Sequence, residues 1–175
     1  MTCRDWPTRA NALTLVRLLL APPLAAAILG GEPRAAALVL ALAVATDLAD
    51  GPLARRLGEA SPLGALVDHA VDATFVAVGS AALAAQGAVT AVLPALIAAA
   101  FAQYALDPGA ADAGPRASTL GRWNGIGYYA LLAAPLLRDA LRLGWPGPGL
   151  VSGLAWLLVA STLFSMLGRL RARWS

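Results

Sequence analysis

Four aspartates stand in a part of the chain that is otherwise apolar enough to enter a membrane. Asp47 and Asp50 lie at the end of one hydrophobic segment, and Asp68 and Asp72 lie near the start of the next. A carboxylate at bilayer depth costs on the order of several kcal/mol unless a partner or water meets it. Four of them so close together require a compensating positive charge, and a divalent cation is the simplest one.

The composition explains why a membrane is the expected environment. Of the 175 residues, 59% are hydrophobic and 13% are charged, and the mean hydropathy is +0.68. An average soluble domain is about one quarter charged. The sequence therefore predicts a polytopic membrane protein.

The basic residues point to lipid rather than to nucleic acid. All 13 of them are arginine, which reflects either a GC-rich genome or a use in bidentate phosphate contacts. They are dispersed at the ends of predicted helices, so anionic lipid headgroups are the expected partner and nucleic acid is not. The single cysteine, Cys3, excludes an intramolecular disulfide and a cysteine metal cluster.

Windows of about 20 residues locate six hydrophobic segments. They cover approximately Ala12–Leu29, Arg34–Arg56, Leu63–Ala85, Ala88–Leu106, Arg122–Leu137 and Leu150–Leu167. Clusters of glycine and proline separate several of them, as at Gly30–Pro33 and in the Asp107–Pro115 loop. We therefore expect an all-α bundle of six transmembrane helices that forms one domain over residues 1–175. The first segment lacks a signal-peptide cleavage site and is expected to be a retained helix.

The distribution of arginine predicts the orientation of this bundle. If the amino terminus is cytoplasmic, nine arginines fall on or near the cytoplasmic side: Arg4, Arg9, Arg55, Arg56, Arg116, Arg122, Arg169, Arg171 and Arg173. Only Arg34, Arg138 and Arg142 fall on the other side. This asymmetry predicts that both termini are cytoplasmic.

The spacing of the aspartates predicts that they converge. Asp47 and Asp50 are three residues apart and Asp68 and Asp72 are four apart, so each pair shares one helical face. The two helices are consecutive and antiparallel, and both pairs lie near the turn that joins them. Four converging carboxylates favour a site for Mg²⁺ or Mn²⁺, with two ions sharing ligands. The alternative is that some of these aspartates cap helices or pair with nearby arginines, Arg55 and Arg56.

These residues resemble the signature of the CDP-alcohol phosphatidyltransferase family. That signature reads Asp-x2-Asp-Gly-x2-Ala-Arg, eight residues, Gly-x3-Asp-x3-Asp. Every specified position is filled in order by Asp47, Asp50, Gly51, Ala54, Arg55, Gly64, Asp68 and Asp72. The motif is highly specific because its fixed positions stand at fixed spacing, and the six-segment layout extends a looser resemblance over nearly the whole chain.

The resemblance implies an enzyme of phospholipid biosynthesis. Family members transfer a phosphatidyl or related group from a CDP carrier such as CDP-diacylglycerol to an acceptor alcohol and release CMP. By this resemblance all four aspartates hold Mg²⁺ or Mn²⁺, and Asp72 is also the general base. The implied site faces the cytoplasm from the inner (cytoplasmic) membrane, and a homodimer is a further expectation.

The other motif positions are expected to contact the CDP part of the donor. Gly51, Ala54 and Gly64 are small enough for a nucleotide or a neighbouring backbone to approach closely. Their alternative role is ordinary packing between helices. Arg55 contacts CDP by resemblance, and its alternative role is to anchor the cytoplasmic end of the helix. Pro52 predicts a kink that could open the site.

Outside the motif, the first segment resembles one branch of the family. Asn11, Thr14 and Arg17 recur at three-residue spacing, and the segment resembles the opening of phosphatidylglycerophosphate and cardiolipin synthases. Arg17, about two turns into a membrane helix, needs an anionic partner. A substrate phosphate and snorkelling towards lipid headgroups are equally open.

Four further residues are candidates for the site, and each also has a purely structural alternative. Arg116 and Arg122, together with Asn124, can receive a phosphate of the acceptor or can serve as loop anchors. His69 follows Asp68 directly and so points to a different helix face from both Asp68 and Asp72. A packing or interface role is therefore expected for His69 rather than metal ligation.

The first-segment resemblance makes glycerol 3-phosphate the leading acceptor. One departure stands against it, because that branch usually carries a lysine-containing segment before the fifth helix, and this chain has Leu120-Gly-Arg-Trp-Asn-Gly125 instead. Phosphatidylglycerol, inositol phosphate and serine remain alternative acceptors.

A transporter coupled to divalent cations or protons is the alternative from a different functional class. Such transporters also place acidic residues inside a bundle, and they often show internal repeats with matching broken helices. The aspartate pattern has no second copy in residues 106–175.

Overall fold

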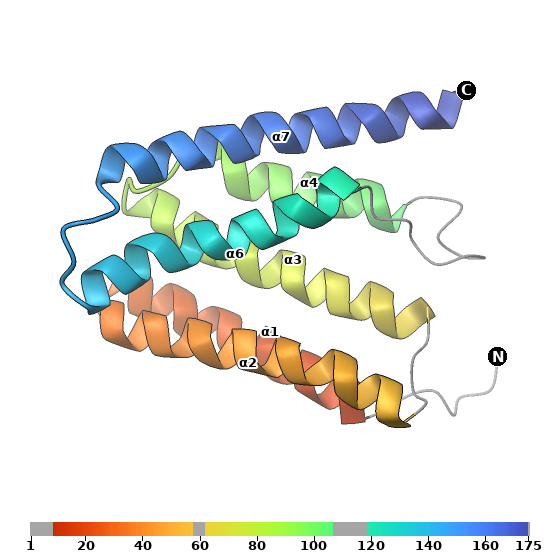
Figure 1. The fold of residues 1–175 in the computed structure, drawn as a ribbon, viewed down its shortest axis with the longest axis horizontal. Coiled ribbons are helices and arrows are strands. Elements are labelled where there is room, and N and C mark those ends of the chain that lie inside the picture. The colour runs from red at the N-terminus through yellow and green to blue at the C-terminus, as the bar shows by residue number, and fades with distance from the viewer. Residues whose placement is uncertain (1–8, 58–61, 107–118, 175) are drawn as a thin grey trace.

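The computed structural model describes residues 9–57, 62–106 and 119–174, with side chains described in 14–48, 64–106 and 119–171. These parts of the chain form six helices and no strand, which confirms the all-helical prediction (Figure 1). The helices are α1 (Arg9–Leu29), α2 (Pro33–Leu57), α3 (Pro62–Ala85), α4 (Val92–Ala105), α6 (Thr119–Ala140) and α7 (Pro148–Trp174). The predicted loop at Asp107–Pro115 lies outside the described residues.

Two glycines end helices in the manner that their sequence context predicts. Gly31 follows α1 with a φ of 69°, and Gly87 follows α3 with a φ of 73°. Only glycine adopts this left-handed backbone without a steric penalty, so both positions form tight helix ends. Pro33 then begins α2, where its missing N–H and fixed φ suit the first helical turn.

Helix boundaries differ most from the predicted segments at the start of α4 and at the end of α7. The fourth helix begins at Val92 rather than Ala88, because the turn through Gly87 occupies the intervening residues. The last helix continues to Trp174 rather than Leu167. Hydropathy falls among its final arginines, but the helix continues through Gly168, because the arginine, leucine and alanine residues that follow all have high helix propensity.

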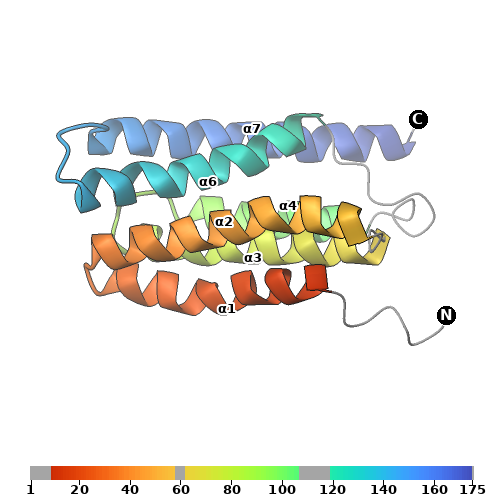
Figure 2. The ribbon, with the colours of Figure 1, turned by 60° about the horizontal axis from the view of Figure 1, so that its bottom comes forward.

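Helix α3 lies at the centre of the bundle. It packs against α1, α4 and α6, while α2 lies against α1 and α6, and α7 covers α4 and α6 (Figures 1 and 2). The core between these helices contains Leu24, Leu40, Phe75, Leu93, Leu132 and Val151, all at most 4% exposed. Helices α2 and α3 both pack against α1 and α6, and the carboxyl-terminal end of α2 lies at the same end of the bundle as the amino-terminal end of α3.

The opposite ends of α1 and α3 are joined directly. The side-chain amide of Gln86 donates hydrogen bonds to the backbone carbonyls of Ile28 at 3.3 Å and Leu29 at 3.1 Å. Closer to the middle of α3, a Cβ on Gly79 would lie 3.0 Å from methyl carbons of both Leu24 and Leu132. The small residue therefore lets α3 approach α1 and α6 closely.

The apolar character of the helices supports part of the membrane prediction. Gly64–Ala85 and Pro148–Arg171 are long and apolar enough to cross a membrane, whereas the apolar stretches Thr14–Leu29 and Val92–Ala105 are shorter. Large apolar side chains also lie on the outside of the bundle, with Leu19 exposed by 73%. Exposed apolar surfaces of this kind mark contact with membrane or protein. The number of spans stays a prediction.

Candidate active site

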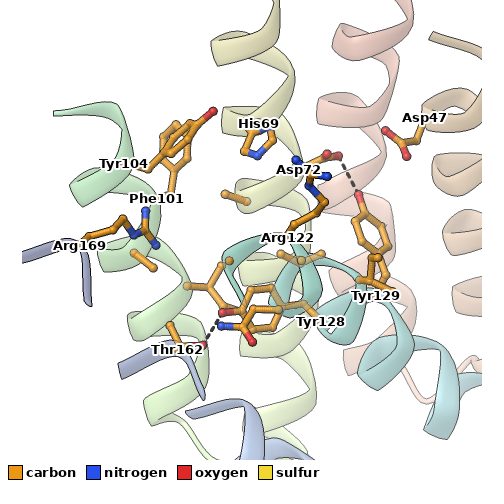
Figure 3. A pocket seen from close by; sticks show the side chains of 18 residues that line it. Asp47, His69, Asp72, Phe101, Tyr104, Arg122, Tyr128, Tyr129, Thr162 and Arg169 are labelled. Atoms are coloured by element: carbon orange, nitrogen blue, oxygen red, sulfur yellow. Dashed lines mark hydrogen bonds between the residues drawn. The ribbon is translucent and has the colours of Figure 1, made fainter. Parts of the chain in front are cut away.

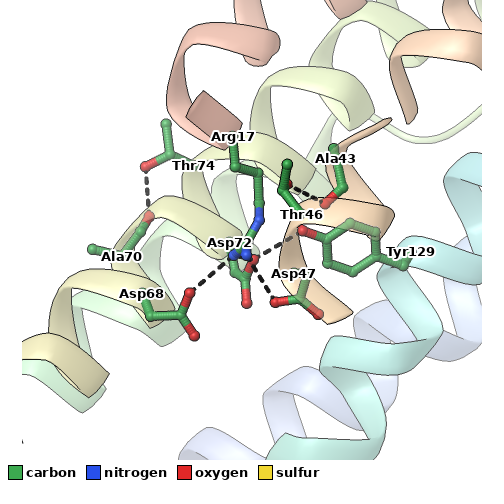
Figure 4. A network of polar contacts seen from close by, with 9 residues as sticks. All are labelled: Arg17, Ala43, Thr46, Asp47, Asp68, Ala70, Asp72, Thr74 and Tyr129. Atoms are coloured by element: carbon green, nitrogen blue, oxygen red, sulfur yellow. Dashed lines mark hydrogen bonds and ion pairs between the residues drawn. The ribbon is translucent and has the colours of Figure 1, made fainter. Parts of the chain in front are cut away.

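Three of the four motif aspartates converge. Asp47 comes from α2, and Asp68 and Asp72 come from successive turns of α3 (Figure 4). One carboxylate oxygen from each residue lies within 4.8 Å of the other two. The side chain of Asp50 lies outside the described residues. The antiparallel approach of α2 and α3 thus brings carboxylates from both pairs to one place, as their spacing predicts.

Arg17 of α1 provides the positive charge at this cluster. One guanidinium nitrogen, Nη1, lies 3.0 Å from Asp68 Oδ1 and 2.5 Å from Asp72 Oδ1, and Nη2 lies 3.0 Å from Asp47 Oδ1. The Arg17 side chain is 0% exposed, so it does not extend along the surface as snorkelling requires. Arg55 and Arg56, the alternative partners that the sequence suggested, lie outside the residues whose side chains are described. Among the described residues, Arg17 from a different helix pairs with all three aspartates.

Tyr129 of α6 is a member of the cluster that the sequence analysis missed. Its hydroxyl donates a hydrogen bond of 2.9 Å to Asp72 Oδ1, and its ring stacks on Phe75 with centroids 6.0 Å apart (Figure 4). The only sequence signal is that Tyr129 follows Arg122 by seven residues and so shares its helical face. The hydrogen bond fixes the orientation of the Asp72 carboxylate.

We expect Tyr129→Phe to lower turnover by about tenfold while leaving the fold intact. The ring would still pack on Phe75, but Asp72 would lose a donor that is worth roughly 1.5–3 kcal/mol when the acceptor is charged. Steady-state kinetics of the transfer reaction that the family resemblance implies measure this loss, with circular dichroism as the check on folding. Unchanged kinetics would show that Tyr129 does not orient Asp72.

A cavity of about 290 Å³ adjoins the carboxylates (Figure 3). Asp47 and Asp72 line one side of it, and α4, α6 and α7 supply most of the remaining wall. Besides the two aspartates, the polar and aromatic residues that line the cavity are His69, Phe101, Tyr104, Arg122, Asn124, Tyr128, Tyr129, Thr162 and Arg169. The carboxylates therefore face a space large enough for a small polar molecule, with two arginines on its wall.

The structure places His69 in an aromatic stack. Its ring lies 5.0 Å from that of Tyr104, with an angle of 21° between the planes. The histidine is exposed and lines the cavity, but it does not belong to the carboxylate cluster found among the described residues. This position agrees with the expected packing role.

Polar contacts between α6 and α7 support the far wall of the cavity. Ser161 donates to Asn124 Oδ1 at 2.6 Å, and Tyr128 and Thr162 share a hydrogen bond of 2.5 Å. Thr162 in turn donates to the Leu158 carbonyl at 2.6 Å. The buried Asn124 is thus fixed by α7, which fits a role in supporting the wall better than one as a mobile loop anchor.

The remaining predicted site residues fall into two groups. Thr14 is buried at 4%, Gly64 is half-buried on α3, and Arg122 is exposed where it lines the cavity. The others lie outside the residues whose side chains are described: Asn11, Asp50, Gly51, Pro52, Ala54, Arg55 and Arg116. Their predicted contacts with CDP or with phosphate therefore stay predictions. Arg169 lines the cavity but had no motif to single it out.

Comparison with known proteins adds two findings to this geometry. A family model described as CDP-alcohol phosphatidyltransferase matches residues 7–167. A curated Pseudomonas fluorescens protein named CDP-diacylglycerol–glycerol-3-phosphate 3-phosphatidyltransferase is 32% identical over 177 residues, covering 94% of this chain and 89% of the relative. No solved structure matches the chain. The span matched by the family model includes Arg17, the three clustered aspartates and Tyr129.

Proposed function

Because the chain belongs to the CDP-alcohol phosphatidyltransferase family, we propose that it transfers a phosphatidyl group from CDP-diacylglycerol to glycerol 3-phosphate and releases CMP. The enzyme class follows from the family match, and the acceptor is suggested by the printed activity of the Pseudomonas fluorescens relative. The observation that carries the proposal is the convergence of Asp47, Asp68 and Asp72 beside a cavity.

The carboxylate cluster fits a divalent cation. Oxygens that share one Mg²⁺ or Mn²⁺ ion lie within roughly 4–5 Å of each other, since each metal–oxygen bond is about 2.0–2.3 Å long. The three carboxylates meet this condition at 4.8 Å. We propose that Asp47, Asp68 and Asp72, with Asp50, hold Mg²⁺ or Mn²⁺. Such an ion supplies Lewis acidity towards the diphosphate of the donor.

Asp72 is the proposed base for the acceptor. It takes the proton of the attacking hydroxyl as the new oxygen–phosphorus bond forms and the bond from that phosphorus to CMP breaks. Tyr129 and Arg17 both contact Oδ1 of Asp72, which holds the carboxylate in one orientation. Asp72 also lines the cavity, so an acceptor bound there can present its hydroxyl to this residue.

The acceptor's own phosphate is proposed to lie towards the arginines of the cavity wall. Arg122 and Arg169 line the same cavity as Asp72 but come from α6 and α7. Guanidinium groups suit bidentate phosphate contacts. This arrangement supports a phosphorylated alcohol over an uncharged one such as inositol without phosphate.

We propose that the six helices span the membrane with both termini on the cytoplasmic side. The amino-terminal end of α1 and the carboxyl-terminal end of α7 lie at the same end of the bundle (Figures 1 and 2). Asp68 lies in the first turns of α3, which begin at that end as well. The cytoplasmic excess of arginine therefore also supports a site that faces the cytoplasm.

The experiment that tests the proposed function is CMP release by the purified protein in nanodiscs. With CDP-diacylglycerol, glycerol 3-phosphate and Mg²⁺, we expect CMP and phosphatidylglycerophosphate in equal amounts. Chelation by EDTA should stop both, and added Mg²⁺ or Mn²⁺ should restore them. Cation flux into liposomes without CMP release would instead support the transporter alternative.

The same assay identifies the acceptor. Phosphatidylglycerol, inositol phosphate and serine are offered in place of glycerol 3-phosphate at equal concentration. The proposal requires the highest kcat/KM for glycerol 3-phosphate. A higher kcat/KM with another alcohol would be consistent with the family reaction but would identify that alcohol as the acceptor.

A further inference from the structure

The Arg17 guanidinium lies among the carboxylates that would hold the metal. It contacts Asp47, Asp68 and Asp72 at 2.5–3.0 Å, and its side chain is 0% exposed (Figure 4). These aspartates are 28–40% exposed, so the arginine is the most deeply buried member of the cluster. Without this positive charge, three neighbouring carboxylates would repel one another.

A guanidinium and a divalent cation cannot both use these carboxylates fully. Both are positive, and in a site of low dielectric their mutual repulsion is strong. A metal ion that takes the carboxylate oxygens therefore weakens the three ion pairs of Arg17. A buried charge that loses such pairs is strongly unfavourable unless another anion replaces them.

The donor brings a suitable anion. The diphosphate of CDP-diacylglycerol must lie next to the metal for the reaction, and hence within reach of the carboxylate cluster. Arginine binds phosphate oxygens in the same bidentate manner as carboxylate oxygens. When a metal displaces the Arg17 guanidinium from the aspartates, the guanidinium can therefore pair with the diphosphate of the incoming donor.

We propose that Arg17 is a positioning residue that couples metal binding to donor binding. Its guanidinium holds the three carboxylates together before ligands bind, and it transfers to the donor diphosphate when metal takes the carboxylates. Arg17 thus weakens the binding of metal alone and strengthens it when the donor is present. By thermodynamic linkage, metal strengthens donor binding by the same factor. This inference rests on the proposed function, because it requires a diphosphate donor.

Mn²⁺ binding to the full-length protein in nanodiscs tests the coupling. Electron paramagnetic resonance measures free Mn²⁺ with and without CDP-diacylglycerol, in the absence of any acceptor, and nanodiscs without protein correct for Mn²⁺ held by the donor itself. For Arg17→Gln we expect Mn²⁺ alone to bind about tenfold more tightly than in the wild type. The factor by which CDP-diacylglycerol increases the Mn²⁺ affinity should be about tenfold smaller in Arg17→Gln than in the wild type, which lies within the range usual for coupled sites.

Arg138→Gln is the matched control. Arg138 pairs with Asp139 on α6 and donates to the Pro146 carbonyl, in the turn that leads to α7. The substitution removes the same charge away from the cluster. Both Mn²⁺ affinities should therefore remain at the wild-type values.

Two further measurements keep the inference open to refutation if Arg17→Gln folds poorly. Arg17→Lys keeps the charge on a compact head that cannot span three carboxylates, so it should bind Mn²⁺ alone several-fold more tightly than the wild type. With metal removed by EDTA, Arg17→Lys should begin to melt at a lower temperature than the wild type. In a separate sample without EDTA, Mn²⁺ should raise the melting temperature of Arg17→Lys more than that of the wild type.

The outcomes separate this inference from the proposed function. Wild-type Mn²⁺ affinity and wild-type donor coupling in the folded Arg17 variants would overturn the role of Arg17 and leave the metal site intact. If the wild type binds no Mn²⁺ even with CDP-diacylglycerol present, and Asp68→Asn gives the same result, the proposed metal site itself would be overturned.

Discussion

Replacing Asp72 with asparagine is expected to reduce turnover by roughly 10²- to 10⁴-fold, the usual contribution of a general base, even when metal and nucleotide saturate the site. Asparagine keeps the size of the side chain and one carbonyl oxygen, but it cannot accept the proton of an alcohol. CMP release should therefore be lost although Mn²⁺ and CDP-diacylglycerol still bind. Kinetics and Mn²⁺ titration of the same preparation measure the two properties separately.

Asp139→Asn serves as the control for this substitution. Asp139 is an exposed aspartate of α6 whose carboxylate pairs with Arg138 at 2.6 Å. Its loss removes a charge without touching the cavity, so turnover should stay at the wild-type level. Full activity in Asp72→Asn would remove the assignment of Asp72 as the base.

Asp68→Asn is expected to weaken metal binding itself. Asp68 supplies one of the three convergent carboxylates, and bound ions carry the largest local charge in such a site. The metal affinity should fall by more than the roughly 10- to 100-fold that the loss of an outer-shell partner causes. Mn²⁺ titration measures the affinity, and Asp47→Asn should behave alike because Asp47 completes the cluster from α2.

Excess metal distinguishes this effect from the loss of the base. Activity in Asp68→Asn should recover in part at high Mg²⁺ or Mn²⁺, because the missing affinity can be offset by concentration. No such recovery is expected for Asp72→Asn. Equal metal dependence in Asp68→Asn and the wild type would exclude Asp68 as a ligand.

Much of the site could be predicted because its information is local in the sequence. The spacing of Asp47, Asp68 and Asp72 predicts which helical faces they occupy, and the short link between α2 and α3 makes the two helices antiparallel. Helix ends marked by glycine and proline were likewise predictable. Hydropathy placed the end of α7 too early, because the helix continues through Gly168 into a polar stretch of arginines.

The partners of these aspartates could not be predicted, because they come from helices distant in the sequence. Arg17 was a candidate with two open roles, and neither role included direct pairing with the aspartates of α2 and α3. Tyr129 and Arg169 belong to no motif, and they reach the site only through the packing of α6 against α3 and of α7 against α4 and α6. Which faces of these helices meet depends on the whole core rather than on any local pattern.

The two hydrogen bonds from Gln86 to the last carbonyls of α1 have a mechanical consequence. They fasten the carboxyl-terminal ends of α1 and α3 to each other, while the ion pairs of Arg17 with Asp68 and Asp72 hold the same two helices together near their other ends. Arg17 and Asp72 lie more than three helical turns away from Gln86. When a ligand takes the carboxylates and these ion pairs are lost, the Gln86 bonds would still fasten the two helices, so the guanidinium can move away from the aspartates without separating α1 from α3.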